Sequence, residues 1–138
     1  MPNEQPGRDF ALAHALLRLG LGVNLITHGL VRLPELAGFA GHVQQMMAKS
    51  WLPLWLVTAA GFAIPFVELT VGALLILGLF FRFALVLGSL LMIVLTLGVC
   101  LAQNWTVAAE QLIYLLVFAA LLASAQYDRY SIDGWRTR

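Results

Sequence analysis

Four long apolar segments, separated by short polar breaks, dominate the pattern of residues along the chain. They span about residues 10–31, 53–81, 83–102 and 106–125. Each is long enough to cross a bilayer as a helix, which takes roughly 20 residues. The runs are continuous rather than alternating, and an open strand in lipid would leave its backbone polar groups unsatisfied. The sequence therefore predicts an all-α integral membrane protein, a four-helix bundle in a single domain over residues 1–138.

A shorter amphipathic segment connects the first two spans. Leu36, Phe39, Val43 and Met46 recur there at helical spacing among polar residues. This pattern predicts a short helix lying on the membrane surface. The alternative is a lid that covers a pocket in the bundle.

Composition strengthens the membrane interpretation and removes several classes of partner. The chain is 61% hydrophobic and only 11% charged, whereas a soluble domain is about one quarter charged. The net charge of +1 offers no basic surface for nucleic acid, so we expect the bilayer and other membrane proteins as partners. A single cysteine rules out an intramolecular disulfide, and no metal-binding motif is present.

The distribution of Lys and Arg predicts the orientation of the spans. With four spans, both termini and the second break lie on one side of the membrane, which then carries five positive residues against two on the other. The five are Arg8, Arg82, Arg129, Arg136 and Arg138, and the two are Arg32 and Lys49. Cytoplasmic segments carry the excess of positive charge. We therefore expect a multi-pass protein of a bacterial-type inner (plasma) membrane with both termini in the cytoplasm.

The first span carries a stripe of polar residues within about 120° of its helical wheel. These residues are His14, Arg18, Asn24, His28 and Arg32. Charges inside a membrane are costly and persist where they are paired or functional. We therefore expect the stripe to face the bundle interior, with His14 near the interface.

Glu68, near the middle of the second span, is the first expected partner of the stripe. Counted from the cytoplasmic helix ends, it lies about one and a half turns deeper than Arg18, a difference that long side chains can bridge. The sequence therefore predicts a buried Arg18–Glu68 ion pair. Such a pair can also serve only to fix the helix register.

A second set of polar residues is expected to converge at the opposite end of the bundle. Glu110 enters the membrane at about the depth of His28. This predicts a second ion pair, between Glu110 and His28, with Arg32 above it. Asn24 and Tyr114 lie just beneath. We expect these five residues to line a polar pocket suited to a neutral, oxygen-bearing ligand such as a quinone headgroup. The alternative is a cluster that is satisfied at the membrane interface.

The spacing of these residues resembles that of a known family. The first span carries Arg18-Leu-Gly20 and His28-Gly29-Leu-Val-Arg32-Leu33, and the second Glu68-Leu-Thr-Val-Gly72-Ala-Leu-Leu-Ile-Leu-Gly78 followed by Arg82. With Glu110 and the closing Asp128-Arg129-Tyr130-Ser131-Ile132-Asp133, these motifs resemble the DoxX family. The usual family tail reads Gly-Pro-Gly-Arg-Tyr-Ser-Leu-Asp, and this chain departs from it at residues 125–128.

The resemblance implies a small four-helix membrane protein. It also points to a redox role, since some DoxX relatives are subunits of a thiosulfate:quinone oxidoreductase and others are tied to redox or oxidative-stress complexes. The leading hypothesis is an accessory subunit of a membrane redox complex that contacts quinone. No residue stands out as catalytic and no covalent cofactor or cofactor motif is evident, so electrons would come from a partner. The alternatives are a purely structural subunit of a larger assembly and an oligomeric carrier of a small solute or protons.

Overall fold

The regular structure of the chain is helical throughout the part that the structure describes. The computed structural model describes residues 5–136, so Arg138 of the orientation argument lies outside it. The long helices are α1 (Gln5–Arg32), α3 (Leu54–Leu77), α4 (Phe81–Leu101) and α5 (Trp105–Ala123). The short ones are η1 (Leu33–Glu35), α2 (Leu36–Met46), η2 (Ala125–Tyr127) and α6 (Ile132–Arg136). The predicted all-α fold is confirmed.

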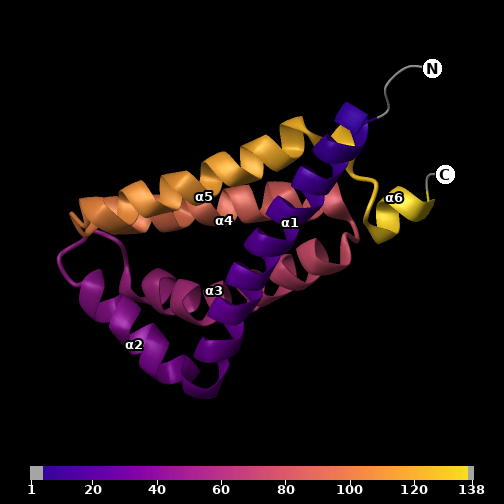
Figure 1. Cartoon of the computed structure of the whole chain (residues 1–138). Helices are drawn as coiled ribbons and strands as arrows, with labels where there is room; N and C mark the ends of the chain where they lie inside the picture. The colour runs from indigo at the N-terminus through magenta and orange to yellow at the C-terminus, as the bar shows by residue number, and fades with distance from the viewer. Residues whose placement is uncertain (1–4, 137–138) are drawn as a thin grey trace.

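Four helical segments are long and apolar enough to cross a membrane, as the hydropathy pattern predicts. They are α3, α4, α5 and the run from Gly7 to Met46, which contains α2 and all but the first two residues of α1. Figure 1 shows α4 and α5 lying alongside each other, while α1 crosses the bundle against α3. Most large side chains on the outer faces are apolar and exposed, as expected where lipid is the solvent.

The break between the second and third spans lies earlier than the sequence predicts. Gly78 ends α3 in the left-handed conformation, with φ of 63°, and Leu79 N donates to Leu74 O at 3.1 Å. Such a bond pattern after a glycine is a common way to end a helix. Arg82 therefore lies in the first turn of α4 rather than between the spans. The apolar residues on either side of Gly78 conceal this boundary in the hydropathy pattern.

Glycines fix the register of α1 against α3. A Cβ added at Gly29 would lie 2.7 Å from the carbonyl oxygen of Pro65, and one at Gly72 would lie 2.9 Å from the carbonyl oxygen of Gly22. The two helices run antiparallel and their backbones touch at both points. Such close approach is typical of small residues at interfaces between membrane helices.

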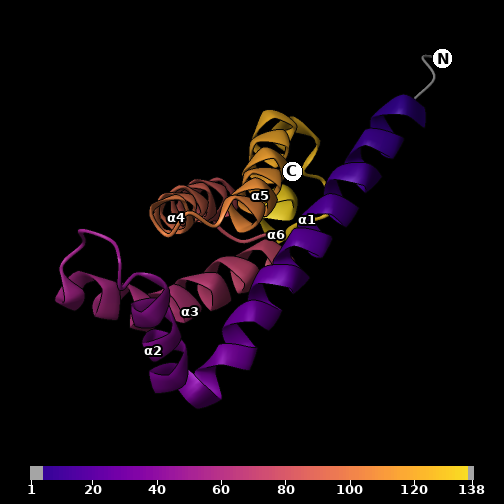
Figure 2. The ribbon, with the colours of Figure 1, turned by 90° about the vertical axis from the view of Figure 1, so that its left-hand side faces the viewer.

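The amphipathic segment forms a helix, as expected, and its apolar face lies against the bundle. Val43 and Met47 pack with Val57 of α3, and Phe39 joins them. In Figure 2, α2 folds back from the end of α1 towards α3. The second half of α1, α2 and the turn between α4 and α5 thus share one end of the bundle, while the N-terminal half of α1 and the segment after α5 share the other (Figure 1).

Candidate functional site

A cavity of about 650 Å³ lies at the α2 end of the bundle. It is lined by the C-terminal halves of α1 and α4, by the N-terminal half of α5, by α2, and by α3 from Leu56 to Glu68. Its walls are mostly apolar, with Phe39, Ile64 and Met92 among the lining side chains. Pockets that bind small molecules have this size and this apolar character, with a few polar groups that fix the ligand's orientation.

All five residues predicted to share a polar pocket line this cavity. They are Asn24, His28, Arg32, Glu110 and Tyr114. The amide nitrogen of Asn24 donates to the Tyr114 hydroxyl at 3.3 Å, which links α1 to α5 across the cavity. The structure therefore brings together residues that stand up to 90 positions apart in the sequence.

Glu68 provides the most deeply buried charge of the cavity wall. Its side chain is only 2% exposed, and both of its carboxylate oxygens accept hydrogen bonds from Arg32 Nη1, that of Oε1 at 2.6 Å. His28 Nδ1 lies 3.9 Å from Glu68 Oε1. The guanidinium of Arg32 also lies over the ring of Phe39, 4.5 Å from its centroid. The carboxylate is thus balanced by one cation that an aromatic face holds in place.

The predicted Glu110–His28 pair does not form. Within residues 5–136, the His28 ring lies beside Glu68 and no ion pair reaches Glu110, which is exposed at the cavity. The reason is that Glu68 is already buried opposite His28, on the helix that packs against α1 along most of its length. Glu110 therefore keeps a carboxylate without an ionic partner at the cavity.

The predicted Arg18–Glu68 pair is wrong, although both side chains are buried, each 2% exposed. The glycine contacts place Arg18 level with the C-terminal end of α3 and Glu68 level with His28. These levels are ten residues apart on α1, or about 15 Å. Counting depth from assumed helix ends misses this register, because α1 begins at Gln5 and its first half extends past the end of α3.

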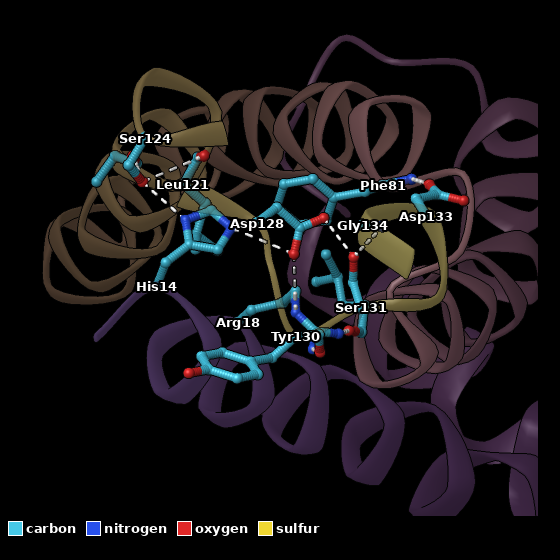
Figure 3. Close-up of polar contacts among 12 residues, drawn as sticks. His14, Arg18, Phe81, Leu121, Ser124, Asp128, Tyr130, Ser131, Asp133 and Gly134 are labelled. Carbon is cyan, nitrogen blue, oxygen red and sulfur yellow. Dashed lines mark hydrogen bonds and ion pairs between the residues drawn. The ribbon is translucent and has the colours of Figure 1, made fainter. Parts of the chain in front are cut away.

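Arg18 belongs instead to a polar cluster at the end of the bundle where the N-terminal half of α1 meets the segment after α5, drawn in Figure 3. Its guanidinium donates to the carbonyl oxygens of Leu75, of Ile76 at 3.0 Å and of Tyr130 at 2.8 Å. Its Nε also lies 3.9 Å from Asp128 Oδ1. A cation is stabilised at a helix C-terminus, where backbone carbonyls lack intrahelical partners. Arg18 therefore binds the end of α3 to the C-terminal segment.

The sequence predicted that His14 lies near the membrane interface. The structure instead buries it in the same cluster as Arg18. It is 4% exposed, its Nδ1 lies 2.9 Å from Ser124 Oγ, and its Nε2 lies 3.8 Å from Asp128 Oδ1 (Figure 3). Asp128 in turn accepts a hydrogen bond from Ser131 Oγ at 2.6 Å. The spacing of His14 and Arg18 on one helical face was the only signal in the sequence, because Asp128 lies outside every predicted span.

The two polar clusters therefore differ in what they can do. The one around Arg18 is filled by the chain's own carbonyls and carboxylate, so it joins the helices and the C-terminal segment. The one around Glu68 opens onto a cavity that can hold a ligand. Its polar groups are placed to bind and orient an amphipathic molecule whose apolar part contacts the walls.

Comparison with known families matches most of the chain to a family model. The model of the family described as methylamine utilisation protein MauE matches residues 10–111, which include Arg18, Glu68 and Glu110. No curated protein and no solved structure matches the chain. The expectation of a small multi-pass membrane family is confirmed, but the match does not single out the DoxX family.

Proposed function

Because the chain belongs to the family of the methylamine utilisation protein MauE, we propose that it is an accessory membrane subunit of a redox system whose cavity holds a quinone-type headgroup. The family's description supports a role beside other proteins of such a system. We place the protein in a bacterial-type inner membrane with both termini in the cytoplasm, on the strength of its positive charges.

One observation carries this proposal, namely the cavity of about 650 Å³ with apolar walls and a small polar region. A quinone has a flat headgroup with two carbonyl oxygens and an apolar tail, so it needs an apolar slot and a few polar groups. The Tyr114 hydroxyl and the Asn24 amide lie on the cavity wall to meet the headgroup. A bound quinone would supply electron transfer, and this chain's residues would bind and orient it.

The pairing of Glu68 with Arg32 supports a neutral ligand. The buried carboxylate is already balanced by the guanidinium, so a charged ligand group placed against this pair would be left unbalanced in a low-dielectric site. A neutral headgroup avoids that cost.

Photolabelling with a quinone that carries a photoreactive group tests the proposal. We expect labelling of the α1 peptide around His28, and competition by excess unlabelled quinone. Ala60 lines the cavity, whereas Ala59 is exposed on the same turn of α3. Ala60→Phe, which fills the cavity, should abolish labelling, and Ala59→Phe should leave it unchanged.

Labelling that persists in Ala60→Phe, or that scatters over the outer faces of the helices, would contradict the proposal. A purely structural role in a larger membrane assembly would then be the better account. Melting temperatures of both variants in detergent serve as the control for folding.

A further inference from the structure

The polar and apolar parts of the cavity wall come from different helices. Most of the charged and amide-bearing side chains on the wall belong to α1 and α5. The α3 residues that line the cavity from Leu56 to Ile64 are all apolar. No lining residue of α4 carries a polar side chain, and these residues are Met92, Val94, Leu95, Leu97, Gly98 and Val99. The cavity is thus polar towards α1 and α5 and apolar between α3 and α4.

The apolar part of the wall reaches the outer surface of the bundle. Val94 and Leu97 line the cavity and are each 56% exposed, and Leu56 of α3 is 41% exposed. Gly98, one turn after Val94, also lines the cavity, and a Cβ added there would meet nothing within 4 Å. All four residues lie in apolar spans, whose exposed surface faces lipid. They form an opening that we call the lateral portal.

Packed side chains close the contact between α3 and α4 on both sides of the lateral portal. Towards the turn that joins these helices, Val71 of α3 and Leu85 of α4 are completely buried in one core cluster. Towards the opposite end, Leu101 of α4 packs against a second cluster that contains Val57 of α3. The lateral portal is therefore a bounded opening that leads from the cavity into the hydrocarbon layer.

We propose that the apolar tail of the quinone-type ligand leaves the cavity through the lateral portal, so that the ligand enters from the lipid and not from water. This inference rests on the proposed function, because it places the second half of the same ligand. With the headgroup beside Asn24 and Tyr114, each part of the ligand meets a wall of its own polarity. An alkyl chain in the lateral portal stays in apolar surroundings along its whole length.

Two photoreactive derivatives of decylubiquinone test the path of the ligand in the full chain, in mixed micelles of detergent and phospholipid. One carries a diazirine on the headgroup, and the other carries it at the end of the alkyl chain. We expect the headgroup probe to label α1 around His28 and the tail probe to label α4 between Met92 and Val99. Excess unlabelled decylubiquinone should compete with both probes, whereas excess phosphatidylglycerol should compete with neither.

Two substitutions that narrow the lateral portal sharpen the test. Val94→Trp places a large ring in the opening, and Gly98→Phe does so at a position where a new side chain has space. Each should raise the concentration of tail probe needed for half-maximal labelling about tenfold, as when two methylene groups lose their apolar contact. Ile93→Trp is the control, because Ile93 is exposed beside Val94 but does not line the cavity. It should leave labelling unchanged.

The outcomes separate this inference from the proposed function. Tail labels on α1, on α5 or scattered over the outer faces of the bundle would overturn the inference, while headgroup labels at His28 would keep the proposed function. The inference also fails if all three variants label alike, or if phosphatidylglycerol displaces the tail probe. Labelling of the cavity by neither probe would overturn the proposed function itself. Melting temperatures of the variants serve as the control for folding.

Discussion

At the residue scale, the cavity depends on one buried carboxylate and the cation that balances it. Glu68 is 2% exposed, and Arg32 reaches it from the end of α1. Side chains on a helix lean towards its N-terminus, so Arg32 extends back one turn to the level of His28. The sequence predicted that these residues face the interior. It could not predict which cation meets Glu68, because that depends on a register that glycine contacts set.

Substitutions at Glu68, Arg32 and Arg18 test the pairing. Arg32→Leu alone should lower the free energy of unfolding by about 3 kcal/mol or more, because it leaves the buried Glu68 carboxylate without its partner. The double variant Arg32→Leu/Glu68→Leu should lose less than the sum of the single losses. The combination Arg18→Leu/Glu68→Leu should be additive, since the two sites share no partner. Unfolding in detergent followed by circular dichroism measures each value, and coupling between Arg18 and Glu68 would show that the register is wrong.

At the element scale, the contact between α1 and α3 sets the position of both polar clusters. Their backbones touch where Gly72 meets Gly22, and where Gly29 meets Pro65. A shift of this contact by one turn would separate Arg32 from Glu68 and Arg18 from the end of α3. The hydropathy pattern predicts the four spans well, because apolar length alone decides which segments enter lipid. It does not encode the register, which follows from backbone contacts.

A pair of glycine substitutions tests this element. Gly72→Ala should destabilise the protein by about 1 to 3 kcal/mol, because the new methyl group would meet the backbone of α1. Gly20→Ala is the control, since a Cβ there meets nothing within 4 Å and alanine favours a helix. We expect it to be neutral or slightly stabilising. Equal losses of melting temperature for the two variants would argue against close packing at Gly72.

The C-terminal segment closes the other end of the bundle, where one of its side chains caps the N-terminus of α4. The backbone N–H of Phe81, in the first turn of α4, donates to Asp133 Oδ2 at 2.8 Å, and Asp133 N donates to Gly78 O at 3.0 Å. Asp133→Ala should cost about 1 kcal/mol, as loss of a capping side chain does. It should also speed hydrogen exchange of the first amides of α4. Asp9→Ala, on an exposed position of α1, is the matched control. Unchanged exchange in Asp133→Ala would show that the cap does not hold α4.

At the scale of the whole molecule, the bundle is closed at one end and hollow at the other. The N-terminal half of α1 and the C-terminal segment are joined by Arg18 and Asp128, while α2 covers the cavity at the far end. Composition and hydropathy predicted the all-α membrane fold, and the helical spacing and depth of the polar residues predicted that the five residues that line the cavity lie at one end of the bundle. The cluster at the closed end could not be predicted, because Asp128 lies in a polar tail whose folding back leaves no periodic signal. The partner of Glu68 could not be predicted either, because it depends on the register of α1 against α3.

Reporter fusions test the orientation of this two-ended molecule. A reporter that is active only in the cytoplasm should be active when fused after Arg138, because positive residues concentrate on the side of the termini. The same reporter inserted between Lys49 and Trp51 should be inactive. The reversed pattern would place the closed end of the bundle outside the cytoplasm.

The central claim is that the cavity beside Glu68 holds a quinone-type ligand, and the most direct measurement is the amount of quinone that copurifies with the protein. Protein purified from quinone-containing membranes in mild detergent is extracted with solvent, and the quinone is quantified by mass spectrometry. We expect wild type and Ala59→Phe to carry similar amounts, and Ala60→Phe, with the cavity filled, to carry little. Equal amounts in all three proteins, or phospholipid alone in wild type, would contradict the account.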